Sequence, residues 1–171
     1  MTDSDFRQAY GRHKDMLYRF AWRMTGSPSV AEDLVHDCFL MLWQDAVTFD
    51  PTRGALRGFL IGVIRNLALK RLCKERPHEK LEETAAVFNP LVSLGLERTE
   101  LVEQAIAQLP PLQREALILA EYEEMSLDEI VEVTGAELAA VKSRLHRARE
   151  NVRRMLAPLL EIKGSACGTG K

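Results

Sequence analysis

The sequence predicts an all-α protein made of two small helical domains joined by a flexible linker, with a helix-turn-helix in the C-terminal domain. Amphipathic patterns with helical spacing cover most of its 171 residues. No segment rich in Val, Ile or Thr alternates between apolar and polar residues, as a half-buried strand would. A hydrophobic content of 46% is sufficient for packed cores. The chain is therefore expected to bury its apolar residues between helices.

The first domain is expected to span residues 1–76 and to contain three helices. Residues 6–25 form the first, which ends at a Gly-Ser-Pro sequence, and residues 29–46 form the second. A loop with Pro and Gly separates it from the third helix, residues 56–76. The inner faces are expected to be Phe6, Tyr10, Leu17, Phe20, Ala21 and Met24, then Ala31, Leu34, Val35, Cys38, Phe39, Leu42 and Trp43, then Phe59, Leu60, Val63, Ile64, Leu67 and Leu72.

Residues 77–96 lose this periodicity and include Pro90 and Gly95, which predicts a linker. The second domain is expected over residues 97–163. Its helices would cover residues 97–109 and 112–123, followed by the helix-turn-helix, whose last helix runs to about residue 160. Residues 164–171 are rich in Gly and are expected to be a disordered tail.

The helix-turn-helix is predicted from its caps and its inner stripe. Ser126 and Glu129 form a potential capping box, and Gly135 can adopt the left-handed conformation that a tight turn requires. The second helix has an inner stripe of Leu138, Val141, Leu145 and Ala148. Its other faces carry Lys142, Ser143, Arg144, His146, Arg147, Arg149, Arg153 and Arg154. Such a helix enters the major groove of DNA in proteins of this design, although a basic helix alone can also be a solvated face.

The net charge of −2 is unusual for a protein that binds nucleic acid, but the charges are arranged in blocks. Residues 28–50 carry −5 and residues 55–80 carry +5. Residues 97–132 carry −8, and residues 142–154 carry +5. This alternation predicts DNA as the partner of the basic blocks and a basic partner, such as a protein, for the acidic blocks.

The remaining composition excludes several classes of site. Three cysteines without disulfide-like spacing indicate a reducing, cytoplasmic environment, and Cys38 and Cys73 are expected to be buried thiols. His36 with Cys38, and Cys73 with His78, lack the spacing of a zinc finger, so no metal site is expected. We also expect no catalytic residues, no cofactor, no signal peptide and no membrane insertion.

Four sequence blocks, in order, resemble the extracytoplasmic-function sigma factors of bacterial RNA polymerase. AEDLVHDCFLMLW (31–43) is similar to the second conserved region of that family, and FDPTRGALRGFLIGVIRNLALKRLCKERP (49–77) to its promoter-melting part. LPPLQREALIL (109–119) followed by SLDEI and VKSRLHRAR is similar to the fourth region. The resemblance covers about residues 6–158, apart from the linker, and it implies a cytoplasmic bacterial transcription-initiation factor that is not an enzyme.

The resemblance also implies a role for each block. Contacts with core RNA polymerase would come from Glu32, Asp33, Leu34, Asp37 and Trp43. Recognition and melting of the minus-10 element would use Arg53, Arg57, Phe59, Arg65, Asn66, Lys70 and Arg71. Recognition of the minus-35 element would use Lys142, Ser143, Arg144, His146, Arg147 and Arg149. The partners would be core RNA polymerase, promoter DNA and an anti-sigma factor that holds the protein inactive.

Two other functions are weighed against this one. A helix-turn-helix regulator that acts without polymerase would leave the acidic second helix and the basic third helix unexplained. A nuclease would need a cluster of ligands, and Asp33 with Asp37, one helical turn apart, has no identifiable third ligand. Co-purification with core RNA polymerase, followed by run-off transcription, separates the three functions.

Overall fold

The computed structural model describes residues 2–75 and 97–165, and over these ranges it contains α-helices, one short 3-10 turn and no strand. The predicted all-α class is therefore confirmed. The linker predicted for residues 77–96, and residues 166–171 of the predicted tail, lie outside the described residues.

The first module contains α1 (Asp3–Thr25), α2 (Pro28–Trp43), the 3-10 turn η1 (Pro51–Arg53) and α3 (Leu56–Glu75). A capping box between Thr2 and Asp5 begins α1, and Gly26 ends it with a left-handed φ of 72°. The second helix ends three residues before the predicted Ala46, because Asp45 adopts a left-handed φ of 53° that no helix can continue. Helix α3 matches its predicted range to within a residue.

The second module contains α4 (Arg98–Ala107), α5 (Pro111–Glu121), α6 (Leu127–Thr134) and α7 (Leu138–Ser165). The helix-turn-helix formed by α6 and α7 is confirmed, with both capping-box bonds present at Ser126 and a φ of 67° at Gly135. The last helix continues beyond the predicted end near residue 160. Pro158 lies within it, because a proline in a helix removes one hydrogen bond without always ending the helix.

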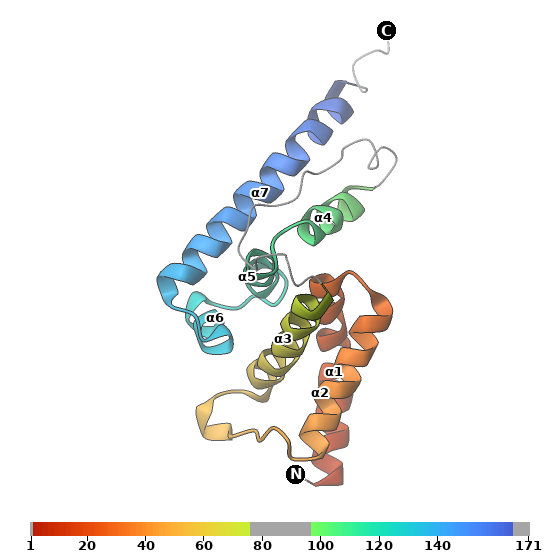
Figure 1. Cartoon of the computed structure of the whole chain (residues 1–171), viewed down its shortest axis with the longest axis vertical. Helices are drawn as coiled ribbons and strands as arrows, with labels where there is room; N and C mark the ends of the chain where they lie inside the picture. The colour runs from red at the N-terminus through yellow and green to blue at the C-terminus, as the bar shows by residue number, and fades with distance from the viewer. Residues whose placement is uncertain (1, 76–96, 166–171) are drawn as a thin grey trace.

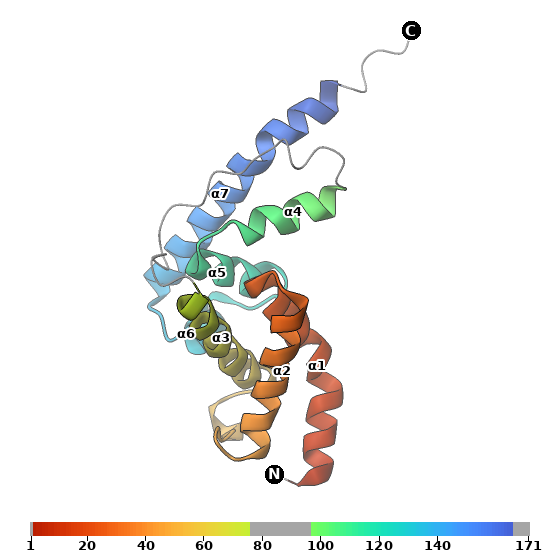
Figure 2. The same cartoon turned by 45° about the vertical axis from the view of Figure 1, so that its right-hand side comes forward.

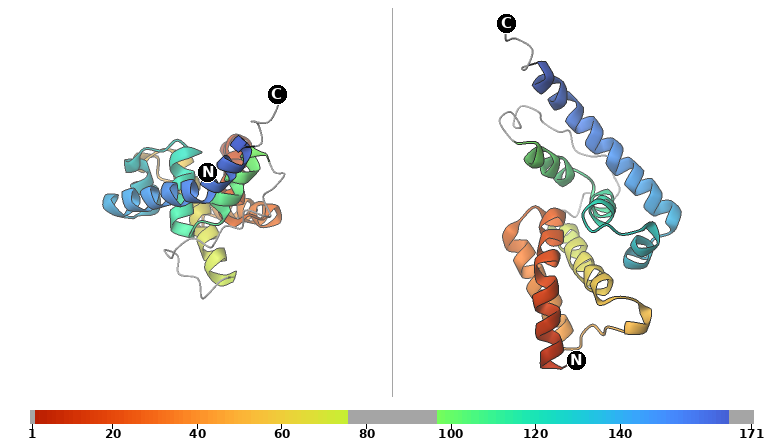
Figure 3. Two further views of the ribbon diagram at one scale, coloured as in Figure 1. Left: turned by 90° about the horizontal axis from the view of Figure 1, so that it is seen from above. Right: turned by 180° about the vertical axis from the view of Figure 1, so that it is seen from behind.

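The two modules pack against each other, with α1, α2 and α3 on one side and α4 to α7 on the other (Figure 1). Figures 1 and 2 both place α3 beside α5 and α6. One group of buried side chains runs through both modules; its largest members include Phe20, Met24, Leu60, Ile118 and Ile130. Helix α7 extends past this body toward the C-terminus (Figure 3).

Four residues expected to be buried are exposed. Tyr10 is 42% exposed, Trp43 50% and Leu138 40%, and Cys73 is exposed in the last turn of α3. Tyr10 and Trp43 pack against neighbouring rings: Tyr10 lies 4.8 Å from Phe39, and Trp43 lies 4.9 Å from Phe6, between ring centroids. Helical spacing identifies a face of a helix, but it does not show whether another element covers that face along its whole length.

Removal of the α6 cap is expected to destabilise the helix-turn-helix. The N–H of Glu129 donates to Ser126 Oγ at 3.3 Å, and the N–H of Ser126 donates to Glu129 Oε2 at 2.7 Å. Ser126→Ala removes the first bond and should lower the free energy of unfolding by about 1 kcal/mol. Chemical denaturation followed by circular dichroism measures the change. The control Ser4→Ala, at an exposed position in α1, should change it by less than about 0.5 kcal/mol; equal effects would contradict the capping role.

The two described cysteines should differ sharply in reactivity. Burial raises the pKa of the Cys38 thiol to about 12, whereas Cys73 is exposed. Because the thiolate is the reactive form, iodoacetamide at pH 8 should alkylate Cys73 and leave Cys38 intact until the protein is denatured. Mass spectrometry of tryptic peptides distinguishes the two sites. Modification of both at similar rates in the native protein would show that the α1–α2–α3 core is open to solvent.

Candidate nucleic-acid interface

The first half of α7 has one buried side and, opposite it, a polar side that faces solvent. Val141, Leu145 and Ala148 are buried, which fixes the rotation of the helix about its axis. On the opposite side, Lys142, His146 and Arg147 are exposed and Ser143 is half-buried. Arg144, three residues after Val141 and four before Ala148, lies instead at the edge of the buried side and is half-buried. The guanidinium of Arg147 donates to Ser143 Oγ, with Nη2 at 2.7 Å. These side chains, one helical turn apart, form a single face that can lie along a DNA groove.

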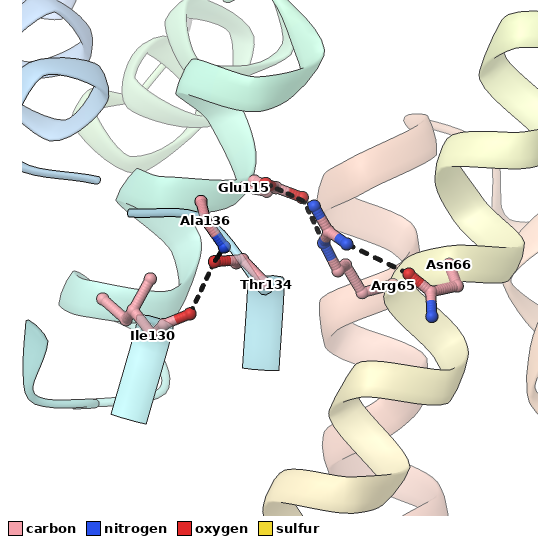
Figure 4. Close-up of polar contacts among 6 residues, drawn as sticks. All are labelled: Arg65, Asn66, Glu115, Ile130, Thr134 and Ala136. Carbon is pink, nitrogen blue, oxygen red and sulfur yellow. Dashed lines mark hydrogen bonds and ion pairs between the residues drawn. The ribbon is translucent and has the colours of Figure 1, made fainter. Parts of the chain in front are cut away.

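The turn before α7 is fixed by hydrogen bonds. The Thr134 hydroxyl donates to the carbonyl of Ile130 at 2.7 Å, and the same oxygen accepts from the N–H of Ala136 at 3.3 Å (Figure 4). The N–H of Gly135 donates to the carbonyl of Val131 at 2.8 Å. Together these bonds fix the angle between α6 and α7.

Arg149, also predicted to contact DNA, lies two helical turns beyond Lys142 on the same side of α7, where it forms an ion pair with Glu121 of α5. Its Nη2 is 2.5 Å from Glu121 Oε1, and its Nε is 3.0 Å from the same atom. Both side chains are about half exposed, at 52% and 47%, so the pair joins α7 to the end of α5 at the surface. Arg149 is therefore already paired in this structure, unlike Lys142 and His146, for which the described residues show no ion pair.

The loop before α3 and one face of α3 line a groove of about 440 Å³. Asp50 Oδ1 accepts from the N–H of Thr52 at 2.9 Å and from its hydroxyl at 2.7 Å. These two bonds cap the start of the 3-10 turn η1. The rings of Phe49 and Phe59 meet at 5.5 Å between centroids. Further lining residues include Arg53, Gly58, Gly62 and Asn66 from the first module and Glu132 and Val133 from α6. The groove thus combines aromatic and polar side chains with a cation at its edge.

The basic residues of α3 divide into two groups. Lys70 and Arg71 are exposed, and Arg71 Nε lies 2.5 Å from Glu75 Oε1 within the same helix. Arg57 and Arg65 instead contact the second module. Arg65 binds Glu115 with two bonds, at 2.7 and 2.9 Å, and also donates to the Asn66 side chain at 3.0 Å (Figure 4).

Arg57 Nη2 donates to the carboxylate of Glu123 at 2.8 Å and to its backbone carbonyl at the same distance. Glu115 is 0% exposed and Glu123 is 6% exposed. Burial raises the pKa of Glu123, and the nearby Arg57 opposes this shift in part. Sequence patterns did not indicate Glu115 or Glu123 as functional residues, although both belong to the acidic block of residues 97–132.

Helix α2 carries an exposed acidic face beside an aromatic cluster. Glu32, Asp33 and Asp37 are exposed, whereas Leu34 is only 6% exposed and packs in the core. At the end of α2, Trp43 lies against Phe6. Leu40 and Tyr10, which were not among the predicted partner contacts, are 40% and 42% exposed. Acidic and apolar side chains together form a surface that suits a protein partner with basic and apolar groups.

Within residues 2–75 and 97–165, no group of three or more His, Cys, Asp or Glu side chains is placed to hold a metal ion. In the same part of the chain, no helix is sufficiently long and apolar to span a membrane.

Comparison with known proteins assigns both modules. Residues 9–77 match the family described as Sigma-70 region 2, and residues 99–152 match Sigma-70, region 4. The ECF RNA polymerase sigma factor SigL of Mycobacterium tuberculosis is 30% identical over 159 residues, which cover 90% of this chain and 89% of SigL. SigW of Bacillus subtilis is 29% identical over 162 residues, with 86% of each chain covered.

The fold also matches solved structures. The sigma factor RpoE of Bartonella quintana, crystallised with the anti-sigma factor NepR, superposes with a TM-score of 0.68 at 25% identity, covering 90% of this chain and 97% of RpoE. CnrH, solved with the cytosolic domain of CnrY, has a TM-score of 0.66 at 23% identity. The order of the two regions, the helix-turn-helix and the similarity along nearly the whole chain agree: this protein belongs to the extracytoplasmic-function (ECF) RNA polymerase sigma factor family.

Proposed function

We propose that the chain binds core RNA polymerase and directs it to promoters that carry two separate elements. The observation that supports this most directly is the presence of two different polar surfaces: the basic face of α7 and the acidic, partly aromatic face of α2. A regulator that acts without polymerase needs only the first surface. In this role the protein positions the polymerase and opens DNA, without catalysing a reaction itself, and it works in the bacterial cytoplasm.

The upstream, minus-35 element is assigned to α7. Lys142, Ser143, His146 and Arg147 share one side of the helix, which the α6–α7 turn holds outward. Arg and Lys can donate to the edges of guanine in the major groove. Arg149 lies beside this face and Arg144 at the edge of the buried side of α7, and both are proposed to neutralise phosphates.

The minus-10 element is assigned to the groove between the loop and α3. Melting requires that an unstacked base be held in a pocket while cations follow the strand. Phe59 and Asn66 line the groove, and Arg53 lies at its edge. Lys70 and Arg71 continue along α3, on the path that a displaced strand would take. Arg57 and Arg65 belong to the same assignment once they are released from the second module.

Core polymerase is assigned to the exposed face of α2, through Glu32, Asp33 and Asp37 with Trp43 at its end. The buried Leu34 would contribute indirectly, by packing in the core beneath this face. An anti-sigma factor is proposed as a second protein partner, because the structure of Bartonella quintana RpoE, which shares the fold over nearly its whole length, contains one.

The polymerase assignment is tested by reversing the charge of α2. Asp33→Lys with Asp37→Lys should abolish assembly with core RNA polymerase and run-off transcription, because both carboxylates are exposed and would meet a basic surface. The fold should remain intact by circular dichroism. The control, Asp15→Lys with Glu124→Lys, changes the net charge equally at exposed sites outside α2.

Assembly at an unchanged level by the α2 variant would overturn this assignment. Sequence-specific footprinting of promoter DNA by the purified chain alone, at affinities comparable with the holoenzyme, would favour the polymerase-independent regulator instead.

The minus-35 assignment is tested by Arg147→Ala. If Arg147 makes a bidentate contact with guanine, the holoenzyme should lose about 1–3 kcal/mol of binding free energy and discriminate less at one base position. Competition assays with single-base promoter variants measure both effects. Arg153→Ala, exposed further along α7, serves as the control and should not change base preference. A uniform loss across all sequences would identify Arg147 as a phosphate contact.

A further inference from the structure

The segment between α2 and α3, residues 44–55, forms one side of the groove assigned to the minus-10 element. We call this segment the groove loop. Half of the residues that line the groove belong to it, from Val47 to Ala55. Apart from the 3-10 turn η1, the groove loop contains no helix, so its shape depends on a few individual hydrogen bonds.

The start of the groove loop is fixed by the end of α2. The N–H groups of Ala46 and Val47 both donate to the carbonyl of Met41, at 2.9 and 3.3 Å. Asp45 adopts the left-handed φ of 53° that turns the chain away from the helix. These features set the direction in which the chain leaves α2 toward Phe49.

The other end of the groove loop depends on one side chain. Asp50 Oδ1 accepts from both the N–H and the hydroxyl of Thr52, and the Asp50 carbonyl accepts from the N–H of Arg53 at 3.1 Å. This arrangement is an Asx turn that also caps η1. All of these partners lie within three residues of Asp50, so the bonds do not require the second module.

Phe49 and Arg53 both take their positions from this turn. The Phe49 ring directly precedes Asp50 and meets the Phe59 ring of α3 at 5.5 Å between centroids. Arg53 is the last residue of η1. An unstacked base is held by aromatic surfaces and its backbone by cations. A change of the backbone at Asp50 would therefore displace a stacking ring on one side and a cation on the other.

The charge of Asp50 is itself unfavourable for binding DNA. The carboxylate is exposed, and the bonds from the hydroxyl and the N–H of Thr52 lower its pKa, so it is ionised at neutral pH. A negative charge beside a chain of phosphates weakens binding. A contribution of Asp50 to recognition must then come from its two bonds with Thr52, which an uncharged amide oxygen also accepts.

We propose that Asp50 is a positioning residue for recognition of the minus-10 element. Its bonds with Thr52 hold Phe49 and Arg53 in the geometry that receives an unstacked base. The groove loop is thus shaped before DNA binds, which lowers the entropic cost of ordering it in the complex. The inference rests on the proposed role of the groove at the minus-10 element.

Three variants of the full-length chain separate the bonds of Asp50 from its charge. Asp50→Ala removes the acceptor, and Asp50→Asn keeps the acceptor but removes the charge. The control Asp15→Ala removes an exposed carboxylate of α1 that does not line the groove. Each variant is assembled with core RNA polymerase and assayed for open-complex formation. The promoter is chosen from run-off transcripts of genomic DNA, and single-base variants of both of its elements are compared.

Asp50→Ala should reduce discrimination among bases of the minus-10 element by about fivefold. Discrimination at the minus-35 element, assembly with core polymerase and helix content by circular dichroism should all stay unchanged, whereas a general loss of structure would alter them. Asp15→Ala should match the unaltered chain in every assay. Unchanged minus-10 discrimination in Asp50→Ala would overturn the proposal.

Asp50→Asn distinguishes the bonds from the charge. Because the amide keeps both bonds and does not repel phosphates, this variant should retain the base discrimination of the unaltered chain and bind promoter DNA at least as tightly. A loss as large as that of Asp50→Ala would show that the charge is required, and it would also overturn the proposal.

Failure of the proposed function gives different results. If the chain does not act with polymerase, the unaltered protein yields no run-off transcript. Asn66→Ala tests the assignment of the groove, because Asn66 lines it from α3. If Asn66→Ala lowers minus-10 discrimination and Asp50→Ala does not, the positioning role alone is wrong. If neither variant changes discrimination, the groove does not bind the minus-10 element, and the role of Asp50 falls with that assignment.

Discussion

The burial of the Glu115 carboxylate constrains how the two modules of this molecule pack together. A fully buried negative charge is tolerated only with a well-placed cation, and Arg65 supplies that cation from the other module. Loss of one partner from such a pair costs about 3–5 kcal/mol, whereas the intact pair contributes little to stability. An interface built in this way is specific without being strong. This pair joins α3 to α5, while Arg57 with Glu123 and the close approach of Gly58 and Gly62 to Val133 add further contacts between α3 and the second module.

Local signals in the sequence were sufficient for most of the helices. Ser126, Glu129 and Gly135 form the bonds that their spacing predicts, and α3 begins and ends within a residue of its expected range. These features depend on atoms close together in the chain. The end of α2 was predicted too late because Asp45 adopts the left-handed conformation, which Asp can do but which no Gly or Pro in the sequence marks at that position.

The relation between the modules could not be derived in this way. Helix α5 is buried from Pro111 to Leu119 because both modules cover it. Its own module covers one side, where Gln113 accepts a hydrogen bond from Asn151 of α7, and the first module covers another, where Glu115 binds Arg65. A stripe of apolar residues cannot indicate that second face. The charge blocks did contain a signal, since −8 and +5 segments in one chain are suited to each other. Their mutual pairing was missed because each block was assigned an external partner.

The sequence separation of the bonds between the modules leads to an expectation about the order in which the chain folds. They join residues far apart: Arg65 and Glu115 are separated by 50 positions, Arg57 and Glu123 by 66, and Met24 and Arg114 by 90. Bonds within the modules span fewer positions, such as 22 between Cys38 and Leu60 and 38 between Gln113 and Asn151, and longer closures carry a greater entropic cost. Each module is therefore expected to fold first as a unit, with docking as a later step. During synthesis the first module would emerge with Arg57 and Arg65 still uncovered, and the two modules would pack against each other only after the second module had folded.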